Sequence, residues 1–174
     1  MANSFIEIEE FGFWANDGFV EAMQLCIINE IENQKLDDLS WINNYKNKLA
    51  LQSLPLIFGG MSMELEFINT DERKEQLNTI IDVIIEKIDA SDEYITGSNL
   101  HNMRYRAMEI LSETGQANFK TAKDFDKAVN DARWFESDGV ADFKDDYKHS
   151  FVLLKKLING LLKTTAASPI DYWI

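Results

Sequence analysis

The chain has few of the residues that reactive sites use: one cysteine, two histidines and two prolines among 174 residues. A single cysteine, Cys26, excludes an intramolecular disulfide and therefore a disulfide-stapled secreted fold. The sequence also lacks a glycine-rich phosphate loop, a Gly-x-Ser-x-Gly elbow and the histidine spacings of zinc or di-iron sites. We therefore expect no cofactor and no metal, and we assign no catalytic residue.

Long apolar runs and a basic leader are absent as well. No uninterrupted apolar stretch approaches the ~20 residues that span a bilayer, and the N-terminal residues do not have the basic and apolar regions of a signal peptide. We expect a cytoplasmic protein that does not contact membranes.

Basic side chains are also few: the chain has 17 of them and 30 acidic side chains, which gives a formal net charge of −13. A surface of this sign repels nucleic acid and anionic lipid, so direct nucleic-acid binding is not expected. Disordered chains of high charge are poor in aromatic residues, whereas this chain has 11 Phe, 5 Tyr and 4 Trp. We expect one folded domain over residues 1–174.

Apolar residues recur mostly with the period of an α-helix. The clearest case is Asp71–Ala90, where isoleucines follow i, i+3, i+4 spacing after a capping residue, Thr70. Further helices are predicted from Asp17 to about Asn33, from a cap at Asp38 through Leu49, from a cap at Ser98 through Leu111, from a capping box at Thr121 through Ala132, and from about Phe143 to Lys163. The predicted fold is all-α, a single-domain bundle of about six helices.

Two segments do not follow this pattern. Phe5–Phe11 alternates apolar and acidic residues, which indicates a short strand or an extended arm. Leu54–Phe67 is expected to form a buried turn followed by a short helix.

Acidic residues form a stripe on the strongest predicted helix. On a helical wheel, Glu75, Asp82, Glu86 and Asp89 lie within about 40° of one line, opposite the isoleucines. Such a stripe is either a solvated outer face or a ridge that meets a cationic partner. We predict that these four residues bind a partner.

A second acidic concentration follows Trp134. Aromatic residues beside carboxylates are typical of interface anchors, although Trp134 is equally compatible with closing a helix onto the core. We predict that Trp134, Glu136 and Asp138 form a second partner-binding region.

Two acidic dyads, Glu72-x-x-Glu75 and Glu86-x-x-Asp89, resemble the magnesium-binding signature of the all-α nucleotide pyrophosphohydrolases. The resemblance implies a metal-dependent hydrolase as an alternative function. One continuous helix would separate the dyads by about 16 Å, too far for a single metal cluster.

A small, acidic, all-helical chain without a catalytic set resembles the immunity proteins of bacterial toxin systems. Its Gly12-Phe13-Trp14-x-x-Asp17 segment is also similar to small bacterial proteins to which no activity attaches. The first resemblance implies a non-enzymatic inhibitor that neutralises a basic toxin or nuclease. A structural subunit that oligomerises through the tail around Trp173 is a further alternative.

Overall fold

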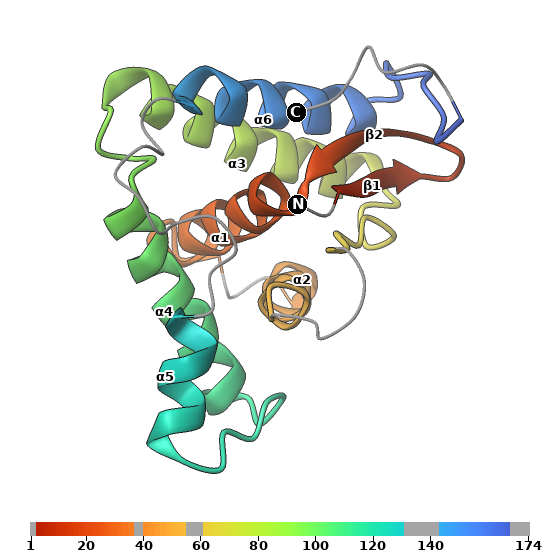
Figure 1. Cartoon of the computed structure of the whole chain (residues 1–174). Coiled ribbons are helices and arrows are strands. Elements are labelled where there is room, and N and C mark those ends of the chain that lie inside the picture. Colours follow the sequence, from red (N-terminus) through yellow and green to blue (C-terminus); the bar gives the residue numbers. More distant parts are fainter. Residues whose placement is uncertain (1–2, 37–39, 55–60, 131–142, 168–174) are drawn as a thin grey trace.

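The computed structural model describes residues 3–36, 40–54, 61–130 and 143–167. Within them, a two-stranded antiparallel hairpin precedes six helices (Figure 1). The elements in chain order are β1 (Asn3–Ile8), β2 (Phe11–Asn16), α1 (Asp17–Asn33), α2 (Ser40–Gln52), α3 (Asp71–Ala90), α4 (Gly97–Glu113), α5 (Ala122–Asn130) and α6 (Lys144–Ile158). The predicted all-α bundle with a short N-terminal strand is confirmed. None of the helices in these residues is both long and apolar enough to cross a membrane.

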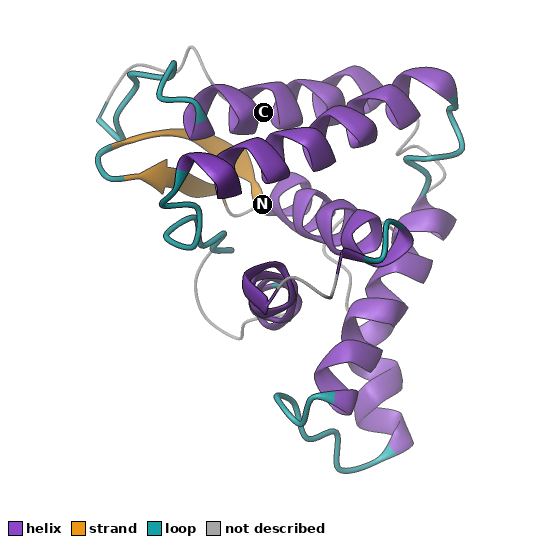
Figure 2. Ribbon diagram, turned by 180° about the vertical axis from the view of Figure 1, so that it is seen from behind, coloured by secondary structure: helices purple, strands orange, loops and turns teal. Residues whose placement is uncertain are grey.

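Helix α1 lies at the centre of the bundle and packs against α2, α3, α4 and α6 (Figures 1 and 2). It is buried on nearly all sides, as expected of a helix whose apolar residues are not confined to one stripe. Three acidic side chains on α1, Asp17, Glu21 and Glu30, are therefore buried too, and two of them pair with a basic side chain from another helix. Glu21 pairs with Arg104 of α4, and Glu30 accepts two hydrogen bonds from Lys87 of α3, at 2.7 and 2.9 Å.

Helices α3 and α6 lie side by side and run antiparallel (Figures 1 and 2). Higher residue numbers on α3 pair with lower ones on α6, as antiparallel packing requires: Asp82 pairs with Lys155, and Asp89 pairs with Lys148. The two helices thus present one continuous charged seam to solvent.

Two predicted helix ends are wrong by several residues, and the backbone shows why. The N-cap of α4 is Thr96, two residues before the predicted cap at Ser98, because the Thr96 hydroxyl accepts a hydrogen bond from the Asn99 amide at 3.2 Å. Helix α6 ends at Ile158 instead of Lys163, because Gly160 adopts a left-handed φ of 67°. The predicted caps at Thr70 and Thr121 are confirmed, because their hydroxyl oxygens accept hydrogen bonds from the Arg73 and Asp124 amides, at 3.3 and 3.1 Å. Asp38 and the end of the fifth predicted helix at Ala132 lie outside the described residues.

The prediction of a short helix before Phe67 is also wrong for residues 61–67, the part of Leu54–Phe67 after the undescribed residues 55–60, because residues 61–70 are not helical. Met61, Met63 and Leu65 are buried and alternate with more exposed residues, which is the period of an extended chain. Side chains hold the segment in place: Gln24 donates to the Ser62 carbonyl at 2.6 Å.

The hairpin connects the beginning of the described chain to its end. The Gly12 amide donates to the Thr164 carbonyl at 2.8 Å, and the Thr164 hydroxyl donates to the Gly12 carbonyl at 2.5 Å. Trp14 adds a hydrogen bond from its indole to the Ala166 carbonyl at 3.3 Å. Glycine is required at position 12, because a Cβ there would overlap the Ile6 carbonyl.

Candidate functional site

The acidic stripe on α3 is partly neutralised within the chain. Asp82 accepts from the Lys155 ammonium at 2.5 and 2.6 Å, and Asp89 accepts from the Lys148 ammonium at 2.6 and 2.7 Å. The structure therefore joins half of the stripe to α6. Partner binding by these two aspartates stays a prediction, and their present role is in the α3–α6 seam.

Glu75 and Glu86, the other two stripe residues, are exposed and form no ion pair with any described residue. They lie on the same helix as the paired aspartates but remain available to solvent. Trp134, Glu136 and Asp138 lie outside the described residues, so their partner-binding role also stays a prediction.

The acidic dyads of the hydrolase alternative lie on one unbroken helix, α3. Over residues 3–36, 40–54, 61–130 and 143–167, no group of three or more His, Cys, Asp or Glu side chains could hold a metal ion. The dyads therefore gain no support as a metal centre from this part of the chain.

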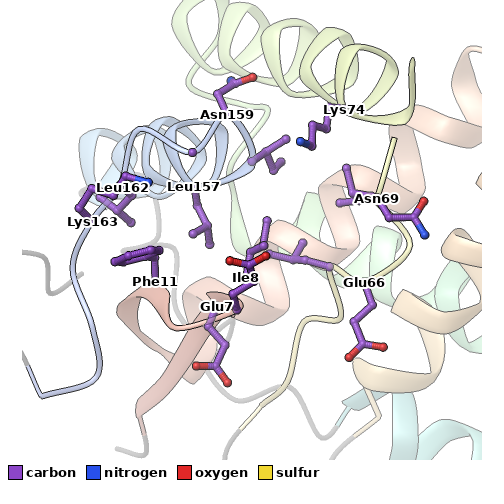
Figure 3. A pocket seen from close by; sticks show the side chains of 15 residues that line it. Glu7, Ile8, Phe11, Glu66, Asn69, Lys74, Leu157, Asn159, Leu162 and Lys163 are labelled. Atoms are coloured by element: carbon purple, nitrogen blue, oxygen red, sulfur yellow. The ribbon is translucent and has the colours of Figure 1, made fainter. Parts of the chain in front are cut away.

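A groove of about 750 Å³ lies where the hairpin tip, the segment 65–69, the start of α3 and the end of α6 meet (Figure 3). Its volume is within the range of protein binding sites. Apolar side chains from these segments line it: Ile8, Phe11, Leu65, Ile68, Leu157, Ile158 and Leu162.

Three carboxylates line the rim of the groove. Glu7 and Glu9 come from the hairpin, and Glu66 comes from the extended segment; Figure 3 shows the carboxylates of Glu7 and Glu66 at the same end. All three side chains are exposed, and none has an ion-pair partner among the residues described. This rim is therefore a concentration of uncompensated negative charge next to an apolar floor.

The opposite side of the groove carries cations that already have partners. The Lys163 ammonium lies 4.6 Å from the centroid of the Phe11 ring, a cation–π contact. Lys74 lies 3.9 Å from the Asp71 carboxylate. The separation of charge across the groove gives a bound molecule a preferred orientation, with its own cations toward the glutamates.

An exposed leucine adjoins this groove. Leu161 has 72% of its surface exposed, the largest exposed fraction among the large apolar residues described. It follows Gly160, which ends α6, and precedes Leu162, which lines the groove. Leu161 therefore adds exposed apolar surface next to the groove.

Two other titratable groups lie on α1: Cys26, which is buried, and Glu32, which is half-buried. Burial, with the negative charge of Glu30, raises the pKa of the Cys26 thiol well above its usual range. The thiolate, which is the nucleophilic form of cysteine, is therefore strongly disfavoured at Cys26. Burial alone would raise the pKa of Glu32, but hydrogen bonds from Arg106 and Lys46 outweigh it and lower that pKa.

The groove was not predicted from the sequence. The alternation of Glu7 and Glu9 with isoleucines was visible, but it did not reveal that α6 ends next to the hairpin. Gly160 was the available signal, because a glycine inside an apolar helical pattern marks a possible C-terminal end. No family model, curated protein or solved structure matches this chain.

Proposed function

We propose that this protein is a non-enzymatic inhibitor of the immunity type, which binds a basic toxin or nuclease through an acidic surface. The observation that carries the proposal is the groove, where three exposed carboxylates without ion pairs border an apolar floor. Uncompensated surface charge accelerates the encounter with an oppositely charged partner, and apolar burial slows dissociation.

The groove supports this function better than the α3 stripe does. Asp82 and Asp89 would have to leave Lys155 and Lys148 before they could meet a partner's cations. Glu7, Glu9 and Glu66 have no such competitor among the residues described. The stripe glutamates, Glu75 and Glu86, contribute to the overall field, which steers a basic protein from a distance.

Two charge-reversal variants with the same net charge separate the groove from the general field. Glu7→Lys with Glu66→Lys alters the groove rim, and Glu75→Lys with Glu86→Lys alters exposed positions on α3. Each variant, and the wild type, is immobilised and exposed to an extract of the native cell at low salt. Retained proteins are eluted with a salt gradient, identified and purified for binding and inhibition measurements.

We expect the wild type and the α3 variant to retain a basic protein that the groove variant does not retain. With the purified partner, the groove variant should associate at least about tenfold more slowly at low salt, and it should fail to inhibit the partner's activity. Equal binding and inhibition by the two variants would contradict the assignment to the groove. Retention of no basic protein by the wild type would contradict the proposed function.

A further inference from the structure

The hydrogen-bonding pattern of the hairpin shows which backbone groups of β1 point outward. Glu7 is opposite Gly12 in the register, yet the Gly12 amide donates to Thr164 on the other side of β2. Glu7 and Gly12 are therefore a non-hydrogen-bonded pair, and the amide and carbonyl of Glu7 point away from β2. By the same alternation, those of Phe5 point outward too.

The two edges of the hairpin differ in what covers them. Thr164 hydrogen-bonds with Gly12 on the outer edge of β2. For β1, no backbone hydrogen bond to any segment other than β2 occurs within the described part of the chain. An edge strand with free backbone groups is a template for a further strand.

This open edge faces the groove. Figures 1 and 2 place the segment 61–70 on the side of β1 away from β2, and Glu7, Ile8 and Glu66 all line the groove. A chain that follows the edge of β1 therefore passes between Glu7 and the extended segment. The backbone of such a chain can hydrogen-bond with the outward-pointing amide and carbonyl of Glu7. The side chains of that chain then alternate between the two faces of the sheet.

We propose that the groove binds an extended segment of the basic partner, which adds an antiparallel strand to β1 with one of its residues directly opposite Glu7. The residue opposite Glu7 lies on the same face as the Glu7 carboxylate, so it is lysine or arginine. In the bound segment, the residues before and after this lysine or arginine point to the opposite face of the sheet, where Ile6 and Ile8 lie. We expect these two residues to be apolar, because that face continues into the apolar floor of the groove. The recognised pattern is thus apolar–basic–apolar, and this inference rests on the proposed function.

A short synthetic peptide, acetyl-Gly-Thr-Ile-Lys-Ile-Thr-Gly-amide, supplies this pattern as a probe. Binding to the full chain is followed by amide shifts in NMR at low salt. In the peptide, N-methylation of the lysine amide removes the donor that faces Glu7, whereas N-methylation of the following isoleucine removes a donor that faces away. The second peptide is the matched control for the steric and entropic effects of the methyl group.

We expect the lysine N-methyl peptide to bind about tenfold more weakly than the parent peptide, which is the effect of losing one hydrogen bond at the upper end of its range. The isoleucine N-methyl peptide should bind within about twofold of the parent. Exchange of the Glu7 amide with solvent should slow at least fivefold when the parent peptide is bound. Glu7→Lys should weaken binding about tenfold, and Asp126→Lys, at an exposed position on α5, should leave it within about twofold.

The outcomes distinguish this inference from the proposed function. If Glu7→Lys weakens binding but the two N-methyl peptides bind equally, strand addition is overturned and an acidic groove that binds cations remains. If neither Glu7→Lys nor lysine N-methylation changes the affinity, both the strand and the groove assignment are overturned. No detectable shift at millimolar peptide also overturns the strand, while the extract experiment still tests the proposed function with an intact partner.

Discussion

Replacing Arg104 with methionine is expected to destabilise the protein by about 3–5 kcal/mol, the cost of leaving a buried charge without its partner. Arg104 is the largest side chain that is fully buried in the described residues. Its guanidinium pairs with Glu21 of α1, and its Nε donates to the Ala128 carbonyl of α5 at 2.9 Å. Methionine keeps the apolar stem but leaves the Glu21 carboxylate in the core without this cation.

A double-mutant cycle isolates this effect from the loss of packing. Urea unfolding, followed by tryptophan fluorescence and circular dichroism, gives the free energy of unfolding for Arg104→Met, Glu21→Met and the double variant. We expect the double variant to be more stable than Arg104→Met alone, because it has no buried carboxylate left to desolvate. Lys156→Met removes an exposed charge on α6, and as a control it should change stability by less than about 0.5 kcal/mol.

Two results would refute this reasoning. A loss below about 1 kcal/mol for Arg104→Met would mean that the Glu21 carboxylate finds water or another donor. A double variant whose loss equals the sum of the two single losses would mean that the side chains do not interact.

Three further predictions concern single residues. Glu9 has a left-handed φ of 59° in the hairpin turn, so Glu9→Gly should raise the free energy of unfolding by roughly 0.5–1 kcal/mol, whereas Glu10→Gly should not. The lowered pKa of Glu32 stabilises the fold above the usual glutamate pKa, and this contribution is lost as the pH falls below about 4.3. Urea titrations from pH 7 to pH 3 should therefore show a steeper loss of stability for the wild type than for Glu32→Gln, and parallel curves would contradict it. The buried Cys26 thiol should react with a thiol reagent at pH 8 at least about a hundredfold more slowly than in urea, and equal rates would refute its burial.

The helices that could be predicted well are those with local signals at both ends. Asp17–Asn33 and Asp71–Ala90 have the same bounds in the sequence and in the structure, because apolar spacing and capping side chains are properties of the segment itself. The end of α6 was missed because Leu161 and Leu162 continue the apolar spacing beyond Gly160. The left-handed conformation of that glycine ended the helix despite the pattern.

The candidate site was harder to predict because it depends on which segments become neighbours. The stripe of acids on α3 is a local property and was found from the sequence. Its neutralisation by Lys148 and Lys155 depends on the antiparallel packing of α6, which no spacing within α3 reveals. The groove joins Glu7 to Leu162, and helical or strand periodicity carries no information across such a separation.

The contact between Gly12 and Thr164 also constrains the order in which the chain folds. These residues are 152 positions apart, and closing a loop of that length costs roughly 4 kcal/mol of entropy, more than two hydrogen bonds return at about 1 kcal/mol each. The contact is therefore expected to form only after the packing of α6 has brought residue 164 close to the hairpin. During synthesis on the ribosome, Thr164 can cover the outer edge of β2 only after α6 has emerged, and within the described residues the folded protein covers that edge and leaves the outer edge of β1 open.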